Sequence, residues 1–281
     1  MTTHDAPIGV FDSGLGGLSV LDAMRARLPR ESMIYIADSG YAPYGEKSDA
    51  FIRQRSKAVA DWLIERGAKM IVVACNTATT HAIGHLRETL TVPIVGVEPG
   101  IKPAAFATAS GVVGVLATAA TLRSERLKAL IAQHEGRCRF ICQAGHGLVE
   151  QIEQGKRDGA IVGDLLTRYL TPMVSAGADT VILGSTHYAL LQAAVRRIFG
   201  DRLALIETGS AIARRVEALL AAGGNAASER AVGGVSYHST ARTADQRQAL
   251  EALARALPMS EPGLSADYLD IAHAGAGVKC L

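Results

Sequence analysis

Two apolar runs of the sequence end in residues that can exchange protons. The run 70–74 is followed by Cys75, and the run 181–184 is followed by Ser185, with His187 two residues further on. A thiol at a strand end, where a helix begins, can act as a base, because the helix N-terminus lowers its pKa from about 8.5. The alternative is a small buried cysteine. A Ser-His hydrolase dyad is disfavoured, because the pattern Gly-x-Ser-x-Gly is absent.

A third apolar run begins at Ile8 and ends in Asp12 and Ser13, which precede a glycine-rich turn. The turn resembles a dinucleotide-binding loop, with Asp38 as the ribose-binding acid, but Ser19 occupies the position of its last glycine. A second interpretation is a tight turn without function. In a third, Asp12 and Ser13 point into a cleft, where an acid beside a hydroxyl can hold an ammonium group or orient a thiol.

Two further segments offer hydrogen-bond donors for an anion. Pro43, Tyr44 and Gly45 form a rigid loop whose backbone N–H groups, at Tyr44 and Gly45, can cradle an anion. A simple surface turn is an equally good interpretation of this loop. Asn76 and Thr77 follow the strand-end cysteine and can donate to a carboxylate at the same helix N-terminus.

The other histidine and cysteine pairs do not predict a metal site. His81 and His85 have the i, i+4 spacing of a metal pair, but no third ligand accompanies them, so a solvent-facing helix surface is favoured. Cys138 and Cys142 flank a short apolar run and are interpreted as two small buried residues on one side of a strand. Cys280 is near the end of the chain and is expected to be incidental.

Strand-like and helix-like patterns alternate along almost the whole chain. The expected strands are 8–12, 33–38, 70–75, 93–98, 112–118, 138–143, 180–185, 203–208 and 235–240. The clearest helical patterns are 19–28, 48–67, 121–136, 160–177 and 210–224. This alternation is typical of βαβ units and parallel sheets, in which ligands bind at the carboxyl ends of the strands.

The pattern restarts near residues 98–102, after a proline-rich stretch. We therefore expect an α/β fold of two pseudo-symmetric domains with mainly parallel sheets and the active site in the cleft between them. The first domain is predicted to comprise 1–98 plus 209–281, and the second 99–208. This arrangement would place Cys75 and Ser185 on opposite walls of the cleft.

The bulk composition is that of an ordinary soluble globular protein. The chain has 281 residues, of which 48% are hydrophobic and 20% charged, with a net charge of +2. The basic residues are scattered, so no nucleic-acid partner is expected. The sequence shows no signal peptide and no apolar run long enough for a membrane span, so we expect a cytoplasmic protein without membrane contact.

Together these motifs resemble the glutamate racemases of the cofactor-independent aspartate/glutamate racemase superfamily, over nearly the whole chain. The matching motifs are IGVFDSGLGGLSV, PYGEKS, VVACNTATTHAI, PIVGVEPG, VLATAATLRS, GLVEQIE and LGSTHY. The resemblance implies interconversion of L- and D-glutamate by two-base α-proton transfer, with no metal, pyridoxal phosphate or other cofactor. It also implies glutamate as the small-molecule substrate, supply of D-glutamate for peptidoglycan, and a homodimer.

The resemblance carries residue roles onto this sequence. It assigns catalytic roles to Cys75, Ser185, Asp12, His187 and Glu153. It assigns substrate binding to Asp12, Ser13, Pro43, Tyr44, Gly45, Asn76, Thr77, Thr118, Thr121, Thr186 and His187. In the family, the first cysteine acts on the α-proton of the D-enantiomer and the second on that of the L-enantiomer.

The sequence departs from the family pattern at the second cysteine. Ser185 stands where the family has cysteine, Ala189 where it has proline, and residues 144–146 where it usually has a Cys-Pro pair. A hydroxyl is a much weaker acid than a thiol, and loss of a positioned acid/base typically costs roughly 10²–10⁴-fold in rate. We favour a glutamate racemase of lowered activity. The alternatives are a divergent single-cysteine enzyme, such as a decarboxylase or isomerase, and a non-catalytic amino-acid-binding protein.

Overall fold

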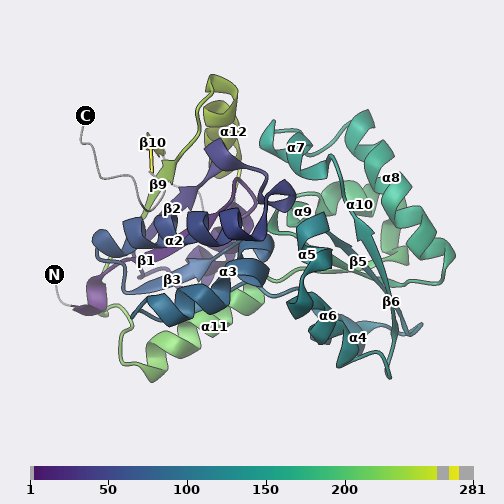
Figure 1. Ribbon diagram of the computed structural model, residues 1–281, viewed down its shortest axis with the longest axis horizontal. Coiled ribbons are helices and arrows are strands. Elements are labelled where there is room, and N and C mark those ends of the chain that lie inside the picture. Colours follow the sequence, from purple (N-terminus) through teal and green to yellow (C-terminus); the bar gives the residue numbers. More distant parts are fainter. Residues whose placement is uncertain (1–2, 258–265, 272–281) are drawn as a thin grey trace.

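The computed structural model describes residues 3–257 and 266–271, which form two lobes (Figure 1). The strands of the described chain are β1 (Ile8–Asp12), β2 (Met33–Ala37), β3 (Met70–Val73), β4 (Ile94–Gly96), β5 (Val112–Ala117), β6 (Arg139–Ala144), β7 (Thr180–Gly184), β8 (Ala204–Ile206), β9 (Val235–Ser239) and β10 (Ala266–Tyr268). Each expected strand is confirmed by one of these, with ends that differ by up to two residues. The short strand β10 was not expected, because three residues carry too little periodicity to stand out.

Twelve α-helices connect the strands within the described residues. They are α1 (Leu18–Arg27), α2 (Asp49–Glu65), α3 (Asn76–Thr89), α4 (Ile101–Ala107), α5 (Ala119–Arg123), α6 (Glu125–Ala132), α7 (Leu148–Glu153), α8 (Ala160–Ser175), α9 (Thr186–Ala189), α10 (Gln192–Phe199), α11 (Gly209–Ala222) and α12 (Ala244–Arg255). The expectation of one helix over 121–136 is wrong. The chain breaks at Ser124, whose hydroxyl caps α6 by accepting from the Leu127 N–H at 3.2 Å.

The two sheets repeat the same strand order, which is the structural basis of the pseudo-symmetry. The first sheet has the order β10-β9-β2-β1-β3-β4, and the second has the order β6-β5-β7-β8. All the paired strands run parallel. The core order β2-β1-β3-β4 is therefore matched strand for strand by β6-β5-β7-β8. The expected α/β fold of two similar units is confirmed, and β3 corresponds to β7.

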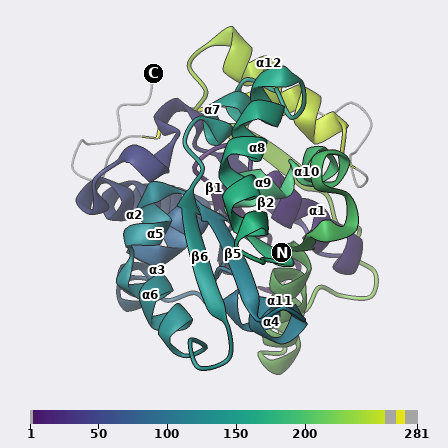
Figure 2. The same ribbon diagram turned by 90° about the vertical axis from the view of Figure 1, so that its right-hand side faces the viewer.

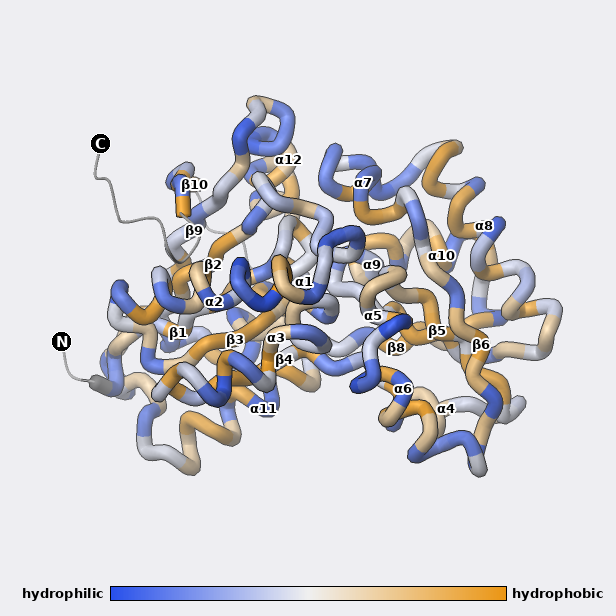
Figure 3. Tube along the Cα trace, viewed as in Figure 1, coloured by the Kyte–Doolittle hydropathy of each residue, from blue (hydrophilic) through white to orange (hydrophobic). Residues whose placement is uncertain are grey.

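Helices cover both faces of each sheet, so the central strands are buried on both sides. In the first lobe, α1, α11 and α12 pack on one face and α2 and α3 on the other. In the second lobe, α7 to α10 pack on one face and α4 and α6 on the other. Apolar residues accordingly concentrate on strands such as β1, β3 and β5 (Figure 3). This double burial explains why the strands read as continuous apolar runs.

The chain passes between the lobes near residues 97–100 and again near 207–208. Val97 belongs to the core of the first lobe, whereas Ile101 belongs to the core of the second. The domain limits 1–98 plus 209–281 and 99–208 stay predictions.

The interpretation of Cys142 as a buried residue is wrong. Cys138 is 5% exposed, but Cys142 lies exposed on β6. The reason is the position of β6 at the open edge of the second sheet, which Figure 2 shows from the outer side of that lobe. Cys280 lies outside the described residues.

No helix within residues 3–257 and 266–271 is both long enough and apolar enough to cross a membrane.

Candidate active site

A small cavity lies between the two lobes, at the carboxyl ends of their central strands. The first lobe lines it with Ser13, Pro43, Tyr44, Gly45, Cys75, Asn76 and Thr77, and the second with Thr118, Val149, Ser185 and His187. The sequence reasoning missed Val149. It lies inside the motif GLVEQIE, so its proximity to Glu153 in the sequence was the available signal.

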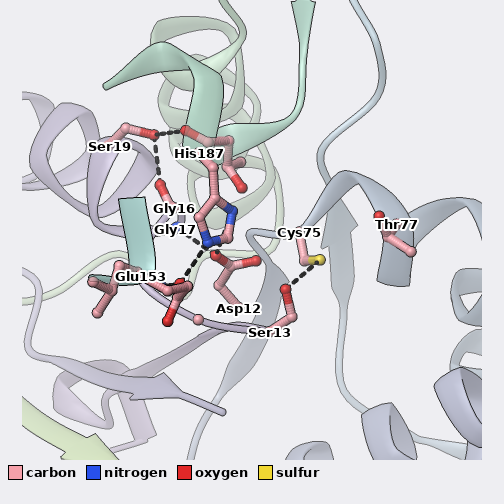
Figure 4. A network of polar contacts seen from close by, with 12 residues as sticks. Asp12, Ser13, Gly16, Gly17, Ser19, Cys75, Thr77, Glu153 and His187 are labelled. Carbon is pink, nitrogen blue, oxygen red and sulfur yellow. Dashed lines mark hydrogen bonds and ion pairs between the residues drawn. The ribbon is translucent and has the colours of Figure 1, made fainter. Parts of the chain in front are cut away.

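Cys75 stands where β3 gives way to α3, as the sequence indicated. It is the N-cap of α3, and its Sγ accepts from the Ala78 N–H at 3.4 Å. On the other side the thiol donates to the Ser13 hydroxyl, with Sγ and Oγ 3.4 Å apart (Figure 4). Ser13 therefore lies beside the thiol and in the cavity wall, and the interpretation of its turn as functionless is disfavoured.

The expected lowering of the Cys75 pKa is wrong for this structure. Burial raises the pKa of the thiol well above its ordinary value, and the nearby carboxylate of Asp12 raises it further. Hydrogen bonds with Ser13 and Ala78 lower the pKa, but less strongly. The helix N-terminus is present, yet desolvation outweighs it, so the thiol form dominates.

Asn76 contributes an amide that the protein itself leaves without partners. Its side chain is buried at 2% exposure and lines the cavity, yet neither Oδ1 nor Nδ2 has a hydrogen-bond partner. Buried polar groups are nearly always paired, so such an amide is well suited to a polar ligand. An amide can donate to a carboxylate and accept from an ammonium group.

Three threonines join the two lobes at the cavity edge. Thr77 of the first lobe lies 2.9 Å from Thr118 of the second, measured between hydroxyl oxygens. Thr118 donates to Thr121 at 2.9 Å, and Thr121 is fully buried behind it. Thr77 and Thr118 face the cavity, whereas Thr121 does not line it.

The loop at Tyr44 is part of the cavity wall. Tyr44 is 1% exposed, and Gly45 is also buried, in the short 3-10 turn Tyr44–Glu46. The interpretation as a surface turn is therefore wrong. A Cβ on Gly45 would come within 3.0 Å of the Thr118 side chain, so the glycine lets the loop approach the second lobe.

Ser185 and Thr186 lie on the wall opposite Cys75, at the junction of β7 and α9. Ser185 is 5% exposed and is the N-cap of α9. Thr186 is also 5% exposed, but its side chain does not line the cavity, and its carbonyl accepts from the Ser19 hydroxyl at 3.3 Å. The equivalence of β3 and β7 makes Ser185 the counterpart of Cys75.

His187 is held between two carboxylates rather than against Ser185. Its Nε2 is 2.6 Å from Glu153 Oε1, and its Nδ1 is 3.9 Å from Asp12 Oδ2 (Figure 4). Because a carboxylate only accepts, Nε2 carries the proton toward Glu153. This orientation disfavours a Ser-His dyad.

Asp12 and His187 influence each other's pKa. Burial lowers the pKa of His187, but the hydrogen bond with Glu153 and the charges of Asp12 and Glu153 outweigh it, so the pKa lies above its ordinary value. Burial raises the pKa of Asp12, although the neighbouring His187 and Cys75 side chains and the Gly17 N–H oppose the rise. Asp12 lies behind the cavity wall, with Oδ2 accepting from the Gly17 N–H at 2.7 Å and Oδ1 unpartnered.

The glycine-rich turn after β1 allows the two lobes to approach each other closely. A Cβ on Gly14 would lie 2.1 Å from Glu153 Oε1, and one on Gly16 would lie 2.4 Å from the His187 backbone nitrogen. Glu153 Oε1 also accepts from the Leu15 N–H at 2.6 Å, across the interface between the lobes. Protein atoms therefore fill the space that a dinucleotide phosphate would need, and the nucleotide interpretation is wrong.

Two other sequence interpretations also change. Asp38 is fully buried and paired with Arg55, so it is not free to bind a ribose. His85 is exposed, but the side chain of His81 is only 8% exposed and lies 3.1 Å from the Ala120 carbonyl. The expectation of a solvent-facing His81 is wrong, because the second lobe covers it. Residues 3–257 and 266–271 contain no group of three potential metal ligands.

Comparisons with known proteins agree with this arrangement. The family model described as Asp/Glu/Hydantoin racemase matches residues 8–216. The chain belongs to this racemase family. It is 54% identical over 250 residues to the glutamate racemase of Cupriavidus pinatubonensis, covering 89% of this chain and 92% of that protein. It is 52% identical to the glutamate racemase of Ralstonia nicotianae, covering 93% and 94%.

Solved structures of glutamate racemases share the fold. The Escherichia coli glutamate racemase, crystallised with L-glutamate and the activator UDP-MurNAc-ala, matches with a TM-score of 0.81 and 37% identity over 95% of this chain and 99% of that one. The Francisella tularensis enzyme, in complex with D-glutamate, matches with a TM-score of 0.81 and 26% identity over 95% and 98%. Membership of the racemase family is thus supported by sequence and fold together.

Proposed function

We propose that this chain is a cofactor-independent glutamate racemase that interconverts L- and D-glutamate and supplies D-glutamate for peptidoglycan in the cytoplasm. The observation that carries the proposal is the cavity flanked by the equivalent strand ends of the two lobes, with Cys75 on one wall and Ser185 on the other. The relatives that are more than half identical are named glutamate racemases, and two structural neighbours contain glutamate. A homodimer, expected from the resemblance, is part of the proposal.

In this proposal Cys75 removes the α-proton of D-glutamate. The thiol must first pass its proton to a base, a role that we assign to the neighbouring Asp12 carboxylate. The substrate's ammonium group favours that step, because a nearby positive charge lowers a thiol pKa. The Ser13 hydroxyl and the Ala78 N–H then donate to the thiolate from the positions that they already hold. The proton taken from one face of the α-carbon stays on sulfur, and the side chain at position 185 delivers a proton to the opposite face.

The remaining polar groups hold the substrate. Asn76 has a free amide, and the backbone N–H groups of Tyr44 and Gly45 lie in the same wall. We assign them, with Thr77 and Thr118, to the substrate's polar groups, where each bond to a charged group contributes about 1.5–3 kcal/mol. Oriented donors of this kind fix the α-carbon between the two walls.

Ser185 is proposed to limit the rate. Its hydroxyl occupies the position of the family's second cysteine, and a hydroxyl gives or takes a proton far less readily than a thiol at neutral pH. Glu153 and His187 are assigned the role of assisting this side of the reaction. We expect turnover to be lower by roughly 10²–10⁴-fold than in the same protein with a thiol at position 185.

The test is α-hydrogen exchange in D₂O, followed by NMR, with D-glutamate and L-glutamate supplied separately. The unaltered protein should exchange the α-hydrogen of D-glutamate faster than it forms L-glutamate. Ser185→Cys should raise interconversion by roughly 10²-fold or more. Cys75→Ser should remove the exchange from D-glutamate. Cys138→Ser is the matched control, because Cys138 is also a buried thiol but lies outside the cavity lining.

A second candidate is a single-thiol enzyme of the same superfamily, favoured by the single cysteine in the cavity lining. If Ser185→Cys neither exchanges nor interconverts glutamate, the glutamate racemase proposal fails. A single-cysteine decarboxylase or isomerase, or an amino-acid-binding protein without turnover, is then the better interpretation.

A further inference from the structure

We propose that Arg55 and Asp38 form a positioning pair that fixes the cavity loop at Pro43–Gly45 through the hydroxyl of Tyr44. The inference rests on the proposed function for its meaning, because this loop carries the N–H groups assigned to the substrate. None of the sequence motifs pointed to Arg55, which lies in the middle of α2.

The two side chains of the pair are fully buried and are joined by two hydrogen bonds. Arg55 Nε donates to Asp38 Oδ2 at 2.7 Å, and Arg55 Nη2 donates to Asp38 Oδ1 at 2.6 Å. Both side chains are 0% exposed. A two-bond fork of this kind fixes the orientation of the carboxylate as well as its position.

Tyr44 is tied to the same carboxylate. Its hydroxyl donates to Asp38 Oδ2 at 2.6 Å, from a ring that is itself buried. Tyr44 and its neighbours Pro43 and Gly45 all line the cavity with Cys75. The carboxylate is thus a buried polar anchor between helix α2 and the cavity loop.

The last part of the chain completes the anchor. Thr240, just after β9, donates to Asp38 Oδ1 at 2.8 Å. Arg55 Nη1 donates to the carbonyl oxygen of Ile271, beyond β10. The strands β2, β9 and β10 are adjacent in the first sheet, so residues far apart in sequence meet at one edge. Through these two bonds Thr240 and Ile271 support the substrate loop.

Stability alone does not account for this pair. Burying two charges costs free energy, and a well-packed apolar pair of similar volume is often as stable or more so. What an apolar pair cannot provide is a carboxylate that accepts from Tyr44, Thr240 and the guanidinium at once. The geometry is therefore explained by positioning of the loop.

The variants Tyr44→Phe and Arg55→Lys test the anchor without creating large cavities. Tyr44→Phe removes the hydroxyl that binds Asp38. Arg55→Lys keeps the positive charge but loses the planar guanidinium, and a lysine ammonium cannot form the same pair of hydrogen bonds. Tyr169→Phe is the matched control, because the hydroxyl of this buried tyrosine donates to the His146 carbonyl at 2.8 Å in the second lobe, and neither residue lines the cavity.

The first readout needs no substrate. The rate of alkylation by iodoacetamide is measured for each cysteine by peptide mass spectrometry. A loosened loop should raise the rate at Cys75 roughly tenfold, because one lost hydrogen bond corresponds to about a tenfold change in a local opening equilibrium. The alkylation rate of exposed Cys142 is the control for reagent activity. The alkylation rate of Cys138, which is buried in the other lobe, is the control for global unfolding.

The second readout is the kinetics of glutamate interconversion in the Ser185→Cys background. We expect KM to rise roughly tenfold in both anchor variants, with a smaller change in kcat, because the loop binds the substrate rather than moving the proton. Tyr169→Phe should change neither value.

The outcomes separate the inference from the proposed function. If Ser185→Cys shows no turnover of glutamate, the proposed function fails, while the alkylation rates still decide whether the loop is anchored. Unchanged Cys75 alkylation in both anchor variants overturns the inference. So does an increase at Cys138 that matches the increase at Cys75, because the pair would then serve overall stability.

Discussion

The contact between Glu153 and His187 gives the sharpest prediction, because one substitution isolates it. Glu153→Gln keeps the size of the side chain and an oxygen that accepts from His187 and from the Leu15 N–H, both now at 2.6 Å. It removes the negative charge. The pKa of His187, which Glu153 and Asp12 hold above its ordinary value, should therefore fall.

The size of the fall follows from the geometry. A hydrogen bond to a charged group contributes about 1.5–3 kcal/mol, against about 0.5–1.5 kcal/mol for a neutral one. The difference is about 1–2 kcal/mol for this contact, which corresponds to about one pKa unit, since a unit is worth 1.36 kcal/mol. Asp12, whose carboxylate is 3.9 Å from Nδ1, remains and prevents a larger fall.

The assay is a pH titration of the histidine ring signals by NMR. The signal of His187 is assigned by its loss in His187→Gln. Glu150→Gln is the matched control, because Glu150 is on the same helix and acts on His187 only through its charge. If Glu153→Gln shifts the His187 pKa no further than Glu150→Gln does, the hydrogen bond does not hold the imidazolium and the reasoning is refuted.

The same shift has a consequence for stability. The folded pKa of His187 is raised above its unfolded value of about 6.5, so its contribution is fully present below pH 6.5 and is lost as the pH rises through the folded pKa. Glu153→Gln should therefore lower the free energy of unfolding more at pH 6 than at pH 9. Denaturant titrations at the two values measure the difference.

Three further substitutions test the packing of the lobes, helix α3 and the loop before β7. Gly16→Ala should lower racemase activity by roughly 10²-fold, because the added Cβ would clash with the His187 backbone at the lobe interface. Gly84 lies on α3 with open space around it, so Gly84→Ala should raise the melting temperature slightly. Burial raises the pKa of Asp179, but hydrogen bonds from Thr108, Ser110 and other donors outweigh it and lower it to about 2. Asp179→Asn should therefore lower the urea midpoint at pH 7, and the difference should shrink as the pH falls from 4 toward 2.

The strand ends were the part of the site that the sequence could predict. Cys75 and Ser185 each follow a continuous apolar run, and in a parallel sheet such runs end at the ligand-binding edge. The position of Cys75 at the start of α3 followed from the same pattern. Local periodicity was sufficient there, because the position of each residue depends on its own strand and helix.

The remaining features depend on contacts between distant segments, which periodicity does not report. Gly14 and Glu153 are 139 positions apart in the chain but lie close together in the structure. This contact explains the glycines of the turn after β1, which the local sequence pattern could not explain. His81 reads as a surface residue on α3, yet the second lobe covers it. The pKa of Cys75 was misjudged for the same reason, because burial by both lobes outweighs the local helix N-terminus.

The positions of the cysteines limit which groups could deliver a proton from the second lobe in the proposed reaction. The free cysteines of the described residues are Cys75, Cys138 and Cys142, and of these only Cys75 lines the cavity. Cys138 and Cys142 lie at the far edge strand of the second lobe, so neither can replace a thiol at position 185. The polar residues that line the cavity from the second lobe are Thr118, Ser185 and His187. Since both imidazole nitrogens point toward carboxylates, the proposed racemase would return the proton on this face through a hydroxyl or through solvent. A solvent isotope effect on interconversion that disappears in Ser185→Cys would identify this step as rate-limiting.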